Sequence, residues 1–432
     1  MHKDVTRTVL PNGLTVHLKE IHTAPIISHW IWYRVGSRNE VPGLTGVSHW
    51  VEHMQFKGTP TFPASVLDKA ISREGGYWNA MTYLDWTAYF ETLPADKIDL
   101  ALRLEADRMV NSVYDTKEVD SERTVIISER ESSENDPLFR LGEAVQKAGF
   151  DRHAYRYEVI GEKEDLHHIQ RDDLVAHYHK YYAPNNALVA VAGDFETAPM
   201  LERLKELYAG IPAGQPANGA LEVETAIVSE RRQVVEGPGQ TTFVQLAYRC
   251  PASAAADFMA LTVVDSLLTG PTSLNMFGGG GISNKTSRLY RALVERELAV
   301  SLNGGLQATI DPYLYNITMI IHPQRKAEEA LAVLDDEICR LQEQVVSPDE
   351  IARAVKQARA LFTYGSENIT NQAFWLGYAD MFANYDWFVN YVAELEKITP
   401  ADVQQAAQKY LTPANRVVGF YLPTGNGGED EA

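Results

Sequence analysis

The order of apolar and polar positions along the chain predicts two kinds of element. Apolar residues alternate with polar ones over residues 14–19 and 315–321, which is typical of strands with one buried face. They recur every three or four positions over residues 95–110 and 349–362, which is typical of helices that pack on a core. Both halves of the chain therefore mix strands with helices, and we expect an α+β protein.

An internal repeat connects the two halves. In each copy a predicted helix is followed by a Pro-Asn turn and an apolar strand, at residues 187–192 in the first copy and 416–422 in the second. The matching residues recur at one constant offset: Ile169, Asp173, Tyr181, Pro184 and Asn186, then Ile398, Asp402, Tyr410, Pro413 and Asn415. We expect two related domains from an internal duplication, each a mostly antiparallel sheet with helices packed on it.

A stretch rich in Pro and Gly at residues 211–219 separates the two copies and is typical of a linker. At 432 residues the chain is also too long for one ordinary hydrophobic core. The predicted boundaries are a first domain at 1–210, a linker at 211–224 and a second, related domain at 225–432.

Charge and cysteine content narrow the possible functions. The chain has 39 Lys and Arg against 58 Asp and Glu, a net charge of −19 that is spread along the sequence. Such a chain repels phosphate backbones, so we expect no nucleic-acid partner, whereas a cavity that attracts basic peptides is compatible with the sign. Cys250 and Cys339 are the two cysteines, so a metal site would have to use His and carboxylate ligands.

The distribution of apolar residues also bears on location. No stretch approaches the roughly 20 apolar residues that a membrane-spanning helix needs, and we expect no membrane partner. We expect a cytoplasmic protein. A periplasmic location stays open, because removal of a signal peptide would leave the same sequence.

The segment around His49, Glu52 and His53 carries the clearest chemical signal. Apolar residues flank it at helical spacing, and Gly58 with Pro60 predicts where the helix ends. Histidines four residues apart lie on one helical face, so both imidazoles can reach one zinc ion. Glu52 shares that face and can move a proton during hydrolysis without binding the metal. The alternative is a chance spacing of two surface histidines.

A catalytic zinc site needs a third protein ligand, and a carboxylate on another element would provide it. Glu122 and Glu129 are seven residues apart in a predicted helix, which puts them on nearly one face and roughly 10 Å apart along its axis. One of them can bind the metal while the other orients a histidine. Without the histidine motif, such a pair would more often be part of a solvated face.

The motifs together resemble those of the pitrilysin family of metallopeptidases, with its inverted His-x-x-Glu-His sequence. The resemblance covers the whole chain and is carried by residues 36–40, 49–53, 56–59, 75–80 and 122–129, in this order. Among the branches of the family, length and duplication are most similar to the short-subunit group of mitochondrial processing peptidases and their bacterial relatives.

The resemblance implies a role for each matching residue. His49, His53 and Glu129 would bind zinc, Glu52 would be the general base, and Glu122 would support the catalytic site. The strand with Asn79 and Ala80 would bind an extended peptide substrate along its edge. The alternative for that strand is an ordinary, half-buried strand rich in aromatic residues.

The second half departs from the family pattern. In this family the second domain usually supplies an Arg and a Tyr to the substrate carbonyl, but residues 287–300 of this chain have Val294 and Val300 there, with one position deleted between them. Valine cannot donate a hydrogen bond to an oxyanion. The approximate counterparts of Glu122 and Glu129 are Ala354 and Leu361, so this half also lacks a metal motif. The chain resembles the metal-bearing subunit of a heterodimer whose homologous partner provides the Arg and the Tyr.

Two functions from different classes fit this sequence. The first is a zinc-dependent endopeptidase or oligopeptidase that cuts peptides or unfolded segments in a chamber formed with a homologous subunit. The second is a non-catalytic assembly or docking subunit, which would not need to keep every metal ligand. Presequence processing and general peptide degradation stay open as roles of the enzyme.

Overall fold

The computed structural model describes residues 4–215, 224–271, 282–365 and 367–425, and their contacts divide the chain into two compact units. The first unit comprises Met1–Arg130, Tyr157–Leu221 and Ser366–Val389. The second comprises Glu131–Arg156, Glu222–Gly365 and Asn390–Ala432. Both units contain a sheet and helices, which confirms the α+β class.

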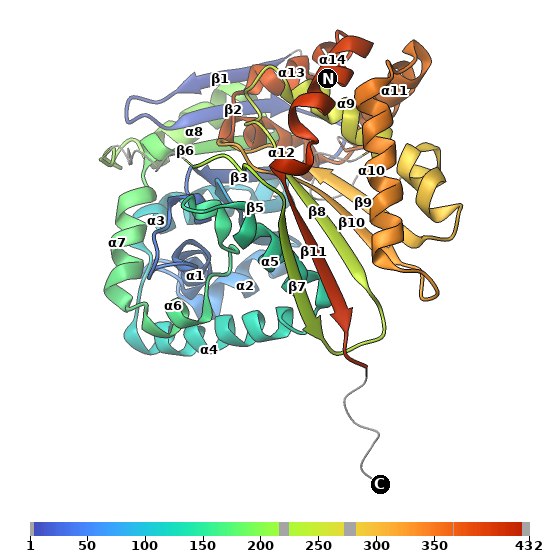
Figure 1. The fold of residues 1–432 in the computed structure, drawn as a ribbon. Coiled ribbons are helices and arrows are strands. Elements are labelled where there is room, and N and C mark those ends of the chain that lie inside the picture. The colour runs from blue at the N-terminus through green and yellow to red at the C-terminus, as the bar shows by residue number, and fades with distance from the viewer. Residues whose placement is uncertain (1–3, 216–223, 272–281, 366, 426–432) are drawn as a thin grey trace. The chain divides into compact units, whose positions relative to one another are not determined.

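The sheet of the first unit has six strands in the order β1-β2-β6-β3-β5-β4 (Figure 1). The β2 and β6 pair is parallel, and the other neighbours are antiparallel. The central strand β6 is buried along its whole length because it is apolar at every position. The strands are β1 (Val5–Val9), β2 (Thr15–Glu20), β3 (Ile26–Tyr33), β4 (Tyr77–Thr82), β5 (Thr87–Pro94) and β6 (Ala187–Gly193).

The sheet is accompanied by helices, some of which pack directly on its strands. Most of them lie wholly in the first unit, and α4 ends a few residues beyond it. They are α1 (Val47–Met54), α2 (Ala64–Arg73), α3 (Asp99–Asn111), α4 (Thr116–Ser133), α6 (Lys163–His168), α7 (Arg171–Tyr181), α8 (Thr197–Tyr208) and α12 (Ile369–Tyr378).

The sheet of the second unit has five strands in the order β7-β11-β8-β10-β9. Only the β7 and β11 pair is parallel among its described strands. The strands are β7 (Arg231–Gly237), β8 (Phe243–Arg249), β9 (Ala299–Leu306), β10 (Leu314–Ile321) and β11 (Arg416–Pro423). The helices are α5 (Pro137–Gly149), α9 (Phe258–Leu268), α10 (Ala327–Glu343), α11 (Pro348–Tyr364) and α14 (Pro400–Tyr410), while α13 (Tyr385–Leu395) begins in the first unit and ends in the second.

The two sheets repeat one topology, which confirms the predicted duplication. Strands β2, β6, β3, β5 and β4 have the same order and directions as β7, β11, β8, β10 and β9, and β1 is an addition to the first sheet. The repeated segment has the same local structure in both copies. Helices α7 and α14 are each 11 residues long, and each is followed by a short 3-10 turn and a central strand.

The compact units differ from the predicted contiguous domains in two segments. Helix α5 follows α4 in the chain but packs on β7, β8 and β11 of the second unit, while α12 packs on β2, β3 and β6 of the first. Gly377 of α12 lies against Trp32 so closely that a Cβ atom would be 2.2 Å from the indole nitrogen. The predicted linker at 211–224 lies largely outside the described residues. No described helix is long and apolar enough to cross a bilayer.

Candidate metal centre

Helix α1 carries the histidine motif, and a buried carboxylate fixes its first turn. Both oxygens of Glu40 accept hydrogen bonds from backbone N–H groups, one from Gly46 and one from Ser48, each at 2.8 Å. Gly46 has a φ of 86°, which favours glycine. Burial raises the pKa of Glu40 to about 7, although the two backbone hydrogen bonds oppose this shift. The buried carboxylate of Glu40 therefore stabilises the first turn of α1 through these two hydrogen bonds.

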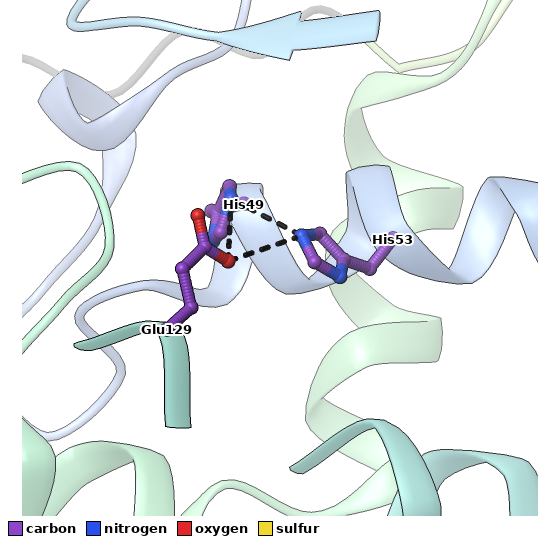
Figure 2. Close-up of side chains that lie close together, drawn as sticks. All are labelled: His49, His53 and Glu129. Carbon is purple, nitrogen blue, oxygen red and sulfur yellow. Dashed lines mark hydrogen bonds and ion pairs between the residues drawn. The ribbon is translucent and has the colours of Figure 1, made fainter. Parts of the chain in front are cut away.

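The structure brings the three predicted ligands together (Figure 2). The Nε2 atoms of His49 and His53 are 3.2 Å apart. Oε2 of Glu129, from helix α4, lies 3.9 Å from Nε2 of His49 and 3.7 Å from Nε2 of His53. Within the described ranges, these residues form the one group of three His, Cys, Asp or Glu side chains placed to hold a metal ion.

The donor set and its spacing fit zinc. A tetrahedral ion with bonds of roughly 2.0–2.1 Å separates its ligand atoms by roughly 3.3 Å, close to the three distances observed. The side chains of His49 and His53 are 13% and 20% exposed, while that of Glu129 is 48% exposed. The two histidines are therefore mostly covered by protein, while the Glu129 side chain is about half exposed to solvent. A catalytic zinc site keeps one coordination position for water or substrate, and the exposed side of the centre would allow access to it.

The pKa values of the two histidines are shifted in opposite directions by their surroundings. Burial lowers the pKa of His49 to about 3, so this imidazole is neutral and can bind a metal. Burial also disfavours the charged form of His53, but the carboxylates of Glu122, Glu52 and Glu129 outweigh it and raise the pKa. A metal ion at His53 must therefore compete with a proton.

Glu122 lies behind the centre rather than in it. Its Oε1 accepts a hydrogen bond of 2.8 Å from Nδ1 of His53, and its Oε2 contacts Nζ of Lys57. The contact with Nδ1 leaves Nε2 of His53 facing His49 and Glu129, which is how a carboxylate orients a metal-binding imidazole. Glu129 thus lies among the candidate ligands and Glu122 lies against His53; the residue spacing left these two positions open, and the family resemblance assigned them in this way. The contact of Lys57 was not expected from the sequence.

Glu52 lies on α1 between the histidines, and its side chain faces strand β4. The hydroxyl of Thr82 donates a hydrogen bond of 2.6 Å to Oε2 of Glu52. Burial raises the pKa of Glu52 to about 7, while this hydrogen bond and His53 act to lower it. A carboxylate with such a pKa is suited to accept and return protons near neutral pH. The sequence analysis did not identify Thr82 as a partner of Glu52, although alternation along the strand places Thr82 on the same face as Ala80.

Asn79 and Ala80 lie on β4, which is the edge strand of the first sheet. Among the described strands β4 pairs with β5 alone. The N–H of Ala80 donates to Oδ1 of Asn79 at 2.9 Å. An edge strand of this kind can receive a further strand through its backbone groups.

In the second unit, Val294 and Val300 are the residues for which the sequence comparison predicted a loss of hydrogen-bond donors. Val294 ends a short π-helical turn, Tyr290–Val294, and Val300 lies on β9 with 54% of its surface exposed. Between them Glu297 has a φ of 55°, in the left-handed region that residues other than glycine seldom adopt. Neither side chain can donate a hydrogen bond.

Two family models match the chain. The model described as insulinase, peptidase family M16, matches residues 15–163, and the model described as the peptidase M16 inactive domain matches residues 168–358. Similar proteins include an uncharacterized zinc protease of Streptomyces coelicolor, 27% identical over 96% of this chain and 89% of the relative. Zinc protease PqqE of Helicobacter pylori is 27% identical over 98% of this chain and 93% of the relative.

Solved structures share the fold. A protease from Helicobacter pylori superposes with a TM-score of 0.87 and 24% identity, covering 97% of this chain and 99% of that chain. A peptidase M16 inactive domain from Pseudomonas fluorescens superposes with a TM-score of 0.85 and 18% identity, covering 99% of this chain and all of that chain.

Proposed function

Because this chain belongs to peptidase family M16, we propose that it is a zinc-dependent endopeptidase or oligopeptidase that hydrolyses peptides or unfolded segments. The observation that carries the proposal is the convergence of His49, His53 and Glu129 beside the buried carboxylate of Glu52. The zinc protease names of similar proteins support it.

The residues of this chain divide the chemistry between them. His49, His53 and Glu129 would hold zinc, which when bound polarises a carbonyl and lowers the pKa of water. Glu52 accepts a proton from the attacking water and passes it to the leaving amine as the C–N bond breaks. Thr82 holds the carboxylate of Glu52, and Glu122 holds the ring of His53.

The substrate would bind as an added strand on β4. An extended peptide along Asn79 and Ala80 would lie on the strand that also carries Thr82, the partner of Glu52. The register of the peptide on β4 would then set which bond reaches the base.

We further propose that catalysis uses a chamber formed with a homologous subunit, in a heterodimer. The support is that Val294 and Val300 cannot stabilise an oxyanion, whereas the metal ligands are all present. The same valines favour a second candidate, a non-catalytic assembly or docking subunit. The complete ligand set favours the enzyme.

Zinc content tests the proposal directly. We expect about one zinc per purified chain, and loss of it in His49→Ala and His53→Ala, because each change removes a ligand. His167→Ala is the matched control, since His167 is exposed on α6 and should not affect binding. Metal analysis together with hydrolysis of a peptide library gives the readout. Unchanged zinc in both ligand variants would refute the assignment.

Thr82 offers a second test. We expect Thr82→Val to keep zinc but to lower kcat about 10- to 100-fold, because a hydrogen bond to a charged group contributes about 1.5–3 kcal/mol. The hydrogen bond lowers the pKa of Glu52, so its loss should move the acidic limb of the kcat/KM profile to higher pH. Thr82→Ser keeps the hydroxyl and should restore both quantities. Identical pH profiles for Thr82→Val and the unmodified protein would contradict this role.

A further inference from the structure

Lys57 lies in the short turn Gln55–Lys57 that follows the metal-binding helix α1, and it reaches across to α4. Its Nζ contacts Oε2 of Glu122 and lies 3.8 Å from Oε2 of Glu118. The side chain of Glu122 is 8% exposed, and that of Glu118 is 53% exposed. The stronger contact of Lys57 is therefore with the buried carboxylate.

Glu122 has its two oxygens engaged on opposite sides. Oε2 contacts Lys57, and Oε1 accepts the hydrogen bond from Nδ1 of His53 at 2.8 Å. A carboxylate held at one oxygen has little freedom to rotate, so the other oxygen stays aimed at the imidazole. The lysine is thereby connected through Glu122 to the ring whose Nε2 faces the other ligands.

The same lysine also links the two helices that supply the ligands. His49 and His53 lie on α1, while Glu129 lies on α4, two helical turns beyond Glu122. Glu118 and Glu122 are one turn apart on α4, so Lys57 can contact both. The position of α4 beside α1 decides whether the carboxylate of Glu129 reaches the histidines. The contact between Lys57 and Glu122 therefore also helps to keep Glu129, the third ligand, within reach of the histidines.

We infer that Lys57 is a positioning residue of the metal site, which acts through Glu122 to aim His53 and to hold α4 at the distance that Glu129 requires. The inference rests on the proposed zinc-binding function. It predicts that Lys57 affects metal affinity although it binds no metal itself. An ordinary surface ion pair would change stability slightly and leave metal affinity unchanged.

The test measures zinc affinity by competition with a chelator on the full-length chain, from which metal has first been removed. We expect Lys57→Met to weaken zinc binding about 10- to 100-fold, the usual cost of losing a partner behind a metal ligand. Lys57→Arg keeps a cationic donor and should recover most of the affinity. Lys117→Met is the matched control, because Lys117 is exposed on α4 and its loss changes the charge equally.

A double-mutant cycle with Glu122→Gln separates action through Glu122 from other effects. If the inference is right, Lys57→Met weakens binding far less when Glu122 is already Gln. An equal loss in both backgrounds, unchanged affinity in Lys57→Met, or a metal-free Lys57→Met chain that is unfolded would each overturn it. Failure of the unmodified chain to bind zinc would instead refute the proposed function.

Discussion

Glu52→Gln is expected to abolish peptide hydrolysis while about one zinc per chain stays bound. Glu52 is not among the three converging ligands, so its amide should leave the metal site intact. An amide cannot take a proton from water, and general base catalysis typically contributes about 10² to 10⁴ in rate. Turnover should therefore fall by about that factor, with little change in KM.

Two measurements check this result on the same sample, a peptide cleavage assay and metal analysis. Glu164→Gln is the matched control, because Glu164 is an exposed residue on α6 and its change should alter neither quantity. Near-normal turnover by zinc-loaded Glu52→Gln would show that another group accepts the proton. Loss of zinc in the variant would show that Glu52 binds or supports the metal, which also contradicts the assigned role.

The second large effect concerns the homologous subunit. We expect the isolated chain to be a poor catalyst and to become active with a partner that carries the missing Arg and Tyr. Loss of one oxyanion donor typically costs about 10² to 10³ in turnover, so a chain with Val294 and Val300 in place of both should be strongly impaired. The donors of the partner would face the metal centre of this chain.

The experiment compares this chain alone, the chain with its partner, and the chain with a partner that lacks the Arg and the Tyr. Activity should rise only in the second case, while zinc stays bound to this chain in all three. Full activity of the isolated chain, with no second protein detectable, would mean that other residues stabilise the oxyanion. Zinc bound without activity in any combination would favour the docking subunit.

Sequence patterns predicted the local structure because they depend on neighbouring residues. The alternation of apolar residues placed β2 and β10 within a residue of their observed ends, Thr15–Glu20 and Leu314–Ile321. The predicted helix at 95–110 corresponds to a 3-10 turn at Ala95–Lys97 followed by α3. Helical spacing likewise put His49 and His53 on one face of α1, since four residues make about one turn.

The tertiary structure alone decided which sheet each helix covers. An apolar face shows that a helix must be buried, but many sheets could bury it equally well. Helix α5 follows α4 of the first unit in the sequence but packs in the second unit, and α12 follows α11 of the second unit but packs in the first. The sequence therefore predicted contiguous domains at 1–210 and 225–432. The contacts instead define two compact units, each built from three separate segments of the chain.

The metal site shows the same division between sequence and structure. The residue types and spacing identified His49, Glu52, His53, Glu122 and Glu129, because few side chains can bind zinc or carry its protons. Spacing by itself did not distinguish the positions of Glu122 and Glu129, which lie seven residues apart on one helix, and the sequence separated their roles only through the family resemblance. Only the packing of α4 beside α1 puts one carboxylate at Nδ1 of His53 and the other at Nε2. Thr82 and Lys57 join the site for the same reason, since hydrogen bonds and ion pairs between distant segments depend on where the folded chain places their atoms.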